Sequence, residues 1–302
     1  MADITMRFHK DMIVLDGAMG TLLADDNLAG GLPPMLLNAM EPDLIKDVHG
    51  RYLRAGAQVL TTNSFEGTRP QLVLADIEDQ FEELNRLSVA LAKECRPEHV
   101  LADIGPCGLM LAPFGDTSED ELFEVYAEQA RVLAAEGPDG IIIESMIDLN
   151  EALCALKAAL SVTDLPVFIT VSFDKYGHMD FTGTSPAEAA QALGAAGASV
   201  VGVNCGLELE PQADYLKEMA AATDLPLLIQ PNAGLLVLDD RGQAAYDRAP
   251  DDMAKAAWEY RELGAQFIGS CCGSTPAFTA AIYGTIGGLD VNYAGRAHAG
   301  GN

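Results

Sequence analysis

The stretch Ala265-Gln266-Phe267-Ile268-Gly269-Ser270-Cys271-Cys272-Gly273 joins a short apolar run to a pair of cysteines. A second stretch, Ser199-Val200-Val201-Gly202-Val203-Asn204-Cys205-Gly206, repeats this arrangement with one cysteine. Both apolar runs have the composition of a buried β-strand. We expect both to be strands of one barrel, which would bring three thiols together at its rim. Three cysteines that leave one coordination position open are typical of a catalytic zinc site.

Apolar, strand-like runs alternate with segments of helical spacing along the chain, in roughly eight strand-then-helix units, the number that closes a barrel. The expected strands are 13–15, 58–62, 100–104, 140–143, 167–171, 199–203, 225–229 and 265–268. The expected helices are 42–55, 80–94, 119–135, 149–160, 186–197, 212–222, 252–263 and one from 276 onward. Strands without polar alternation indicate a parallel sheet that is buried on both faces.

We therefore predict an α/β fold, a single-domain (β/α)8 TIM barrel over residues 1–293, followed by a loosely ordered tail at 294–302. The alternative is an open, doubly wound sheet. Glycines follow the first strand in Asp16-Gly17-Ala18-Met19-Gly20, but the third glycine of a dinucleotide fingerprint is missing.

Composition narrows the class of protein. With 302 residues, of which 49% are hydrophobic, the chain is long enough to bury a sizeable core. A net charge of -27 argues against nucleic acid as a partner. The apolar runs are too short to span a membrane, and the start lacks the pattern of a signal peptide, so we expect a cytoplasmic protein. Six cysteines in such a chain indicate reduced thiols rather than a disulfide framework.

The active site of such a barrel lies at the C-terminal ends of its strands. The first polar residues after the expected strands form one ring: Asp16, Gly17, Thr62, Asn63, Gly105, Glu144, Ser172, Asn204, Cys205, Asn232, Cys271 and Cys272. One strand separates the strand of Cys205 from that of the paired cysteines, so three thiolates can share one ion. Gly273 permits the turn that both adjacent cysteines need in order to ligate.

Each candidate also has a structural interpretation. A single cysteine is more often a buried core residue, as we expect for Cys95, Cys107 and Cys154. Glu144 either binds a substrate ammonium group, acts as a base, or is a salt-bridged structural carboxylate, and Asp16 has the same alternatives. The scattered histidines (His9, His49, His99, His178 and His298) are expected at the surface, which disfavours a histidine-ligated metal. Lys175 is expected in an exposed loop.

With these residues identified, the chain resembles the homocysteine S-methyltransferase family from about residue 13 to residue 286. The family includes the homocysteine-binding module of cobalamin-dependent methionine synthase and betaine–homocysteine methyltransferase. The resemblance rests on six motifs: Asp16-Gly17-Ala18-Met19-Gly20-Thr21, Thr62-Asn63-Ser64-Phe65, Ile143-Glu144-Ser145, Asn204-Cys205-Gly206, Pro231-Asn232-Ala233-Gly234 and Cys271-Cys272-Gly273.

The resemblance implies a role for each site residue. Cys205, Cys271 and Cys272 would ligate zinc, with Asn232 as a possible fourth ligand before substrate arrives. Substrate-binding residues would be Asp16, Gly17, Ala18, Met19, Asn63 and Glu144, and the catalytic set would be the three cysteines with Glu144. Two positions differ from relatives: Ser270 replaces a common glycine, and Glu66 replaces a tyrosine of betaine-using enzymes.

The leading hypothesis is therefore zinc-dependent methyl transfer to the thiolate of L-homocysteine, which gives methionine. The favoured donor is methylcobalamin on a separate corrinoid protein, and the alternatives are S-methylmethionine, S-adenosylmethionine or a related small onium compound. The acceptor could also be a different thiol. Two other classes stay open: a zinc- and thiol-binding module without turnover, and a zinc-free barrel enzyme such as an aldolase.

Overall fold

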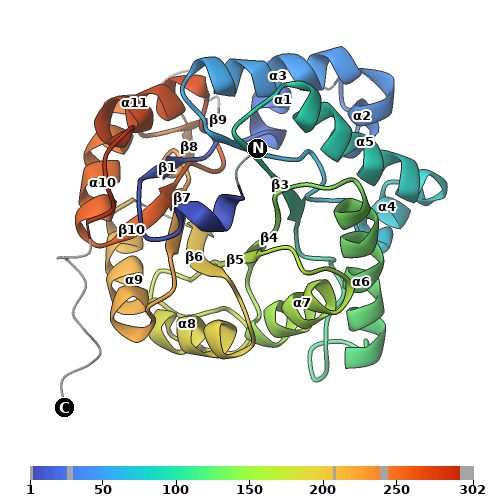
Figure 1. Ribbon diagram of the computed structural model, residues 1–302. Helices are drawn as coiled ribbons and strands as arrows, with labels where there is room; N and C mark the ends of the chain where they lie inside the picture. Colours follow the sequence, from blue (N-terminus) through green and yellow to red (C-terminus); the bar gives the residue numbers. More distant parts are fainter. Residues whose placement is uncertain (1–2, 26–29, 207–208, 239–243, 293–302) are drawn as a thin grey trace.

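The computed structural model describes residues 3–25, 30–206, 209–238 and 244–292 of the chain, so the predicted tail at 294–302 lies outside the described residues. Eight parallel strands form one sheet in the order β1-β10-β7-β6-β5-β4-β3-β2 (Figure 1). These strands are β1 (Ile13–Val14), β2 (Val59–Thr61), β3 (His99–Ile104), β4 (Gly140–Met146), β5 (Val167–Val171), β6 (Val200–Cys205), β7 (Leu227–Pro231) and β10 (Ala265–Ile268).

The two ends of this sheet meet and close the barrel. Leu15, which follows β1, forms a parallel bridge with Val59 of β2. The Asp16 amide donates to the Val59 carbonyl at 3.1 Å, and the Gln58 amide donates to the Val14 carbonyl at 2.8 Å. The predicted single-domain (β/α)8 fold is therefore confirmed.

Helices surround the barrel (Figure 1). They are α1 (Gly20–Asp25), α2 (Leu37–Met40), α3 (Pro42–Arg54), α4 (Arg69–Leu74), α5 (Phe81–Glu94), α6 (Glu119–Ala135), α7 (Leu149–Val162), α8 (Pro186–Ala195), α9 (Leu209–Ala222), α10 (Pro250–Glu262) and α11 (Pro276–Ile286). Proline opens α3, α8, α10 and α11, where its missing N–H costs no helical hydrogen bond. Capping boxes at Ser118 and Ser185 fix the starts of α6 and α8.

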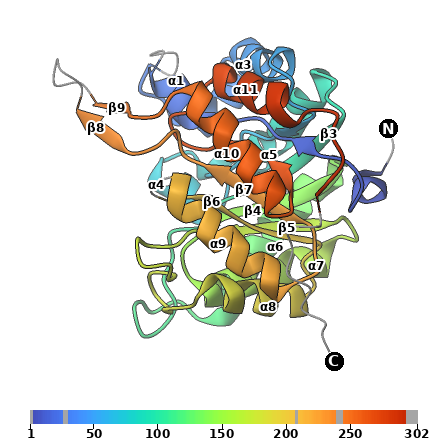
Figure 2. The same ribbon diagram turned by 90° about the vertical axis from the view of Figure 1, so that its left-hand side faces the viewer.

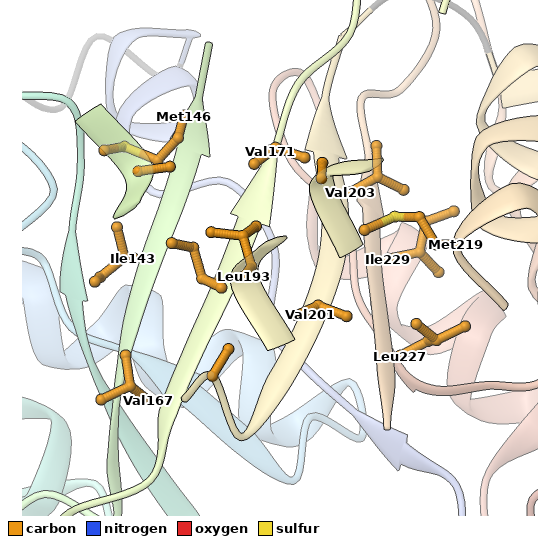
Figure 3. Packing of buried hydrophobic residues seen from close by; sticks show 14 of the residues in the cluster. Ile143, Met146, Val167, Val171, Leu193, Val201, Val203, Met219, Leu227 and Ile229 are labelled. Carbon is orange, nitrogen blue, oxygen red and sulfur yellow. The ribbon is translucent and has the colours of Figure 1, made fainter. Parts of the chain in front are cut away.

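Two apolar layers stabilise this arrangement. Alternate strand residues point into the barrel, where Phe168 and Phe267 pack edge to face at 5.1 Å between ring centroids. The N-terminal 3-10 helix Ile4–Arg7 lies across the end of the barrel at which these two rings pack (Figure 1). The Phe8 ring, which follows this helix, contacts both phenylalanines. The intervening strand residues face the helices: Figure 3 shows Val171, Val203 and Ile229 beside side chains from α8 and α9.

A β-hairpin was not expected from the sequence. The strands β8 (Leu236–Leu238) and β9 (Ala244–Tyr246) pair as an antiparallel hairpin between β7 and α10. Figure 2 shows this hairpin projecting from the barrel. At its base, the Tyr246 ring lies against Gly273, where a Cβ atom would come within 2.1 Å of the ring. The hairpin therefore packs directly on the turn that carries the paired cysteines.

Two sequence-based predictions about burial are wrong. His49 and His99 are buried rather than at the surface, because α3 presents His49 to the core and His99 begins β3 beside Asp139. Cys107 is buried as predicted, but Cys95 and Cys154 are only half-buried. His9 and His178 are exposed, whereas His298 lies outside the described residues.

Among the helices that the structure describes, none has the length and apolarity to cross a membrane.

Candidate metal centre

The three predicted thiols meet at the C-terminal end of the barrel. The Sγ atoms of Cys205, Cys271 and Cys272 all lie within 4.8 Å of one another. Cys205 is the last residue of β6, and Gly269 and Ser270 carry the chain from β10 to the cysteine pair. The structure thus brings together the three residues that were predicted from the sequence as metal ligands.

Local backbone geometry explains how the thiols converge. Cys205 has φ 57°, in the left-handed region, which re-aims its side chain at the end of the strand. Gly273 has φ 77°, so the turn after the cysteine pair occurs as predicted. Backbone hydrogen bonds hold this turn to β7: the Cys271 amide donates to the Pro231 carbonyl at 2.7 Å. The Ala233 amide donates to the Cys272 carbonyl at 2.9 Å.

The predicted fourth ligand, Asn232, lies beside the thiols. Its Nδ2 donates to the Gly206 carbonyl at 2.7 Å. Its Oδ1 is buried and has no hydrogen-bond partner among the described residues. Three sulfur atoms this close together match the sulfur-rich coordination that zinc prefers, and the Asn232 side chain is hydrogen-bonded to one of them, Cys205. The residues present therefore fit a zinc ion.

The thiols also perturb one another. Hydrogen bonds from Cys271 and Cys272 lower the pKa of Cys205 well below its usual range, with a further contribution from Asn232. The same hydrogen bonds to Cys205 raise the pKa of Cys271 and of Cys272.

A cavity of about 570 Å³ opens beside the thiols. Most of the predicted substrate-binding residues line it: Gly17, Ala18, Met19, Asn63 and Glu144. Gly17 has no room for a side chain, since a Cβ atom would lie 2.6 Å from the Ser274 hydroxyl. Asn63 donates from Nδ2 to the Pro34 carbonyl and to Asn38 Oδ1, which holds the segment before α2 against the cavity.

Asp16 lies beneath this cavity rather than among its lining residues. Its carboxylate accepts hydrogen bonds from the Thr61 amide at 2.9 Å and the Thr61 hydroxyl at 3.0 Å. Burial raises the pKa of Asp16 to about 7. The observed contacts therefore hold the loop after β1 to β2, and substrate binding by Asp16 stays a prediction.

A carboxyl that the sequence analysis missed, Asp103 of β3, lines the same cavity and lies within hydrogen-bonding reach of Glu144. Burial and then the proximity of Asp16 raise the pKa of Glu144 to about 8. Burial and then the charge of Glu144 raise the pKa of Asp103 well above its usual value. Asp103 Oδ1 has no partner within the described part of the chain. A cation such as a substrate ammonium group would stabilise the ionised form of both carboxyls.

Asp103 did leave a signal in the sequence. It stands two residues after Leu101, whose side chain points into the barrel, so Asp103 must point the same way one layer higher. A second missed residue, Gln230, carries the same signal, because it stands two residues after the inward-facing Leu228. Its buried Oε1 finds no partner in the described structure, and its side chain lines the cavity.

Comparison with known proteins identifies the class. Residues 13–286 match the homocysteine S-methyltransferase family, and the chain therefore belongs to this family. The fold is also that of the Escherichia coli homocysteine methyltransferase MmuM. The metallated form of MmuM superposes with a TM-score of 0.75 at 24% identity, covering 91% of this chain and 96% of MmuM. The oxidized form of MmuM gives a TM-score of 0.76.

Two curated relatives are methionine synthases from mycobacteria. The protein of Mycobacterium leprae (strain TN) is 30% identical over 294 residues, which is 91% of this chain and 24% of that protein. The protein of Mycobacterium tuberculosis (strain ATCC 25618 / H37Rv) is 30% identical over 295 residues with the same coverage. The chain thus spans about a quarter of the length of these relatives.

Proposed function

We propose that this chain is a zinc-dependent S-methyltransferase that transfers a methyl group to the sulfur of L-homocysteine, giving methionine. The observation that carries the proposal is the placement of three thiols and the Asp103–Glu144 carboxyl pair around one cavity. Homocysteine has a thiol at one end and an ammonium group at the other, so it complements both features. Membership of the homocysteine S-methyltransferase family supports the same substrate.

Cys205, Cys271 and Cys272 would hold the zinc ion, with Asn232 Oδ1 as the fourth ligand before substrate binds. When bound, zinc lowers the pKa of a thiol that joins its ligands, so that this sulfur is nucleophilic at neutral pH. Glu144 and Asp103 would bind the substrate ammonium group, and the loop from Gly17 to Met19 would contact its carboxylate end. Fixing both ends of the substrate aims its sulfur at the donor methyl group, and such positioning contributes several kcal/mol to catalysis.

The proposed donor is methylcobalamin on a separate corrinoid protein, which would approach through the open C-terminal face of the barrel. S-methylmethionine or another small onium compound is the alternative donor, and a different thiol is the alternative acceptor. We place the enzyme in the cytoplasm, where the reducing environment keeps the three site thiols available for metal.

The first test is metal content, with X-ray absorption at the zinc edge before and after L-homocysteine is added. The proposal expects about one zinc per chain and an additional sulfur ligand when homocysteine binds. Absence of zinc after reconstitution would return the cysteines to a structural role and favour a zinc-free barrel enzyme.

The second test is Cys272→Ser, with Cys154→Ser on helix α7 as the matched control. Cys272→Ser should abolish methyl transfer while the barrel stays folded by circular dichroism, and Cys154→Ser should retain activity. Full activity of Cys272→Ser would refute the proposal. Wild-type protein that binds homocysteine but transfers no methyl group from methylcobalamin or any onium donor would be a binding module.

A further inference from the structure

A second, smaller cavity of about 110 Å³ lies beyond the C-terminal ends of β3 and β4. In the described structure, it has no lining residue in common with the cavity beside the thiols. Ser145 of β4 lines the thiol cavity and Ile147, two residues later, lines the second one. The two cavities are therefore separate neighbours on the same face of the barrel.

Aromatic and aliphatic side chains form most of the wall of this second cavity. Phe114, from the segment between β3 and α6, and Phe181, from the segment between β5 and α8, both line it. Their rings meet edge to face with 5.2 Å between centroids and an interplanar angle of 65°. Leu109 and Met110 add further apolar surface. The π-faces of aromatic rings attract cations that come within about 6 Å of the ring centroid.

Two carboxylates complete the wall. Glu151 is only 8% exposed, and its Oε1 accepts a hydrogen bond from the Tyr126 hydroxyl at 2.6 Å and another from the Cys107 amide at 3.3 Å. Asp148 caps helix α7 by accepting a hydrogen bond from the Asn150 amide at 2.7 Å. Among the described residues that line this cavity, none carries a positive charge. The site thus combines negative charge with apolar surface.

We infer that this second cavity binds the methylated onium group of a small cation, a quaternary ammonium or a sulfonium. A primary ammonium group needs acceptors for its N–H donors, and here Glu151 Oε1 and Asp148 Oδ1 already accept hydrogen bonds within the protein, unlike the unpartnered Asp103 Oδ1 of the first cavity. A methylated onium group has no N–H donors, and its methyl groups can pack against the rings. The carboxylates and the π-faces of the rings stabilise its positive charge. The cavity volume of about 110 Å³ corresponds to roughly four water-sized groups of about 30 Å³ each. This volume accommodates a nitrogen or sulfur atom together with its methyl groups.

This inference does not rest on the proposed methyl transfer, because it concerns different residues and a different cavity. An onium cation is nevertheless the chemical class of the small alternative donors considered above. Binding can be measured in the same protein whether or not the thiols prove active, so failure of one idea is distinguishable from failure of the other.

The experiment titrates the protein with choline and with its neutral carbon isostere, 3,3-dimethylbutan-1-ol, and follows the methyl proton resonances by NMR. Trimethylsulfonium is the second cationic probe, and n-butylammonium tests a primary ammonium. Each titration is repeated with saturating L-homocysteine. We expect both onium probes to bind in the presence and absence of homocysteine, and the neutral isostere and butylammonium to bind at least about tenfold more weakly.

Two variants locate the site. Phe181→Leu keeps apolar volume but removes a ring, and Glu151→Gln keeps shape but removes charge; each should weaken choline binding by roughly fivefold or more. Glu124→Gln, at an exposed position on α6, is the control and should bind choline as the wild type does. Equal binding of the neutral isostere, loss of choline binding with homocysteine, or unchanged binding in both variants would overturn the inference.

Discussion

The side chain of Asn204 binds Ser145 through both of its amide atoms. Its Oδ1 accepts from the Ser145 amide at 2.9 Å, and its Nδ2 donates to the Ser145 hydroxyl at 2.8 Å. Ser145 has φ 63°, so these bonds hold it in a conformation that non-glycine residues rarely adopt. Because Ser145 follows Glu144 and Asn204 precedes Cys205, one buried side chain links the carboxylate end of the cavity to the thiol end.

We expect Asn204→Ala to lower kcat/KM for homocysteine by at least about tenfold, because Glu144 and Cys205 would lose their fixed relative position. The free energy of unfolding should fall by about 1–3 kcal/mol, since the part-buried Ser145 amide loses its partner. Steady-state kinetics and urea unfolding measure the two effects.

Thr170→Val is the matched control for this variant. It removes only the hydrogen bond that the Thr170 hydroxyl donates to Asn204 Oδ1 at 2.8 Å, and leaves both bonds to Ser145 in place. Thr170→Val should lower stability while kcat/KM stays within about threefold of the wild type. Equal losses of kcat/KM in Asn204→Ala and Thr170→Val would show that Asn204 acts through stability alone.

Asn232 provides a prediction about metal affinity. The proposed function assigns its unpartnered Oδ1 as a zinc ligand that substrate sulfur replaces. Asn232→Ala should therefore weaken zinc binding by roughly tenfold without homocysteine, and leave zinc binding almost unchanged when homocysteine is saturating. Competition with a chromophoric chelator measures both affinities. Gln191→Ala, at an exposed amide on α8, should affect neither; an equal effect of Asn232→Ala in both states would contradict the assignment.

The carboxyls of the cavity predict how amino-acid binding depends on pH. The pKa is raised to about 8 in Glu144, and the pKa of Asp103 is also raised, in both cases mainly by burial. Below about pH 8 the Glu144 carboxyl is protonated, and a neutral carboxyl cannot form an ion pair with an ammonium group. Binding should therefore tighten as pH rises from 6 to 8.5, by roughly tenfold or more.

L-Methionine is the ligand for this measurement, because its thioether has no proton to lose over this range. Calorimetric dissociation constants at several pH values give the dependence. Glu144→Gln removes one of the two titrating groups and should flatten the curve as well as weaken binding. A dissociation constant that is the same at pH 6 and 8.5 would exclude these carboxyls as the ammonium site.

The fold was predictable where several signals coincide. The strand Val167–Val171 and the helix Glu119–Ala135 have the predicted bounds, because an apolar run and a capping serine mark them. The helices α1 and α4 were missed, since six residues show too little of a helical period. The hairpin of β8 and β9 was missed because each strand has three residues, and those of β8 are exposed despite being apolar.

The thiols of the site were predicted completely from the sequence, but its carboxylates were predicted only in part. Cys205, Cys271 and Cys272 follow apolar runs, and a barrel necessarily gathers the C-terminal ends of its strands. Asp103 was missed because it lies inside the strand β3, before the strand's last residue, rather than after it. Glu144 was expected just after a strand, whereas β4 continues to Met146. A search that considers only the polar residues following a strand therefore overlooks polar residues within the strand whose side chains line the cavity.

His49 provides the last prediction, which concerns stability. Both imidazole nitrogens of this buried residue lack a hydrogen-bond partner in the described structure. Burial lowers the pKa of His49 to about 4, compared with about 6.5 in an unfolded chain. As pH falls, the unfolded chain takes up this proton first, so the stability from neutral His49 is complete above about pH 6.5 and is lost between pH 6.5 and 4.

The variant His49→Leu keeps an apolar side chain at this position and removes the titration. Relative to the wild type, it should gain about 2 kcal/mol in free energy of unfolding when the pH is lowered from 7.5 to 5. Urea unfolding at both pH values measures this difference, in which the contributions of all other titrating groups cancel. Gln191→Leu, at an exposed and non-titrating position on α8, is the control and should show no such gain. If His49→Leu and the wild type lose stability in parallel, His49 must already find a proton-accepting partner in the folded protein.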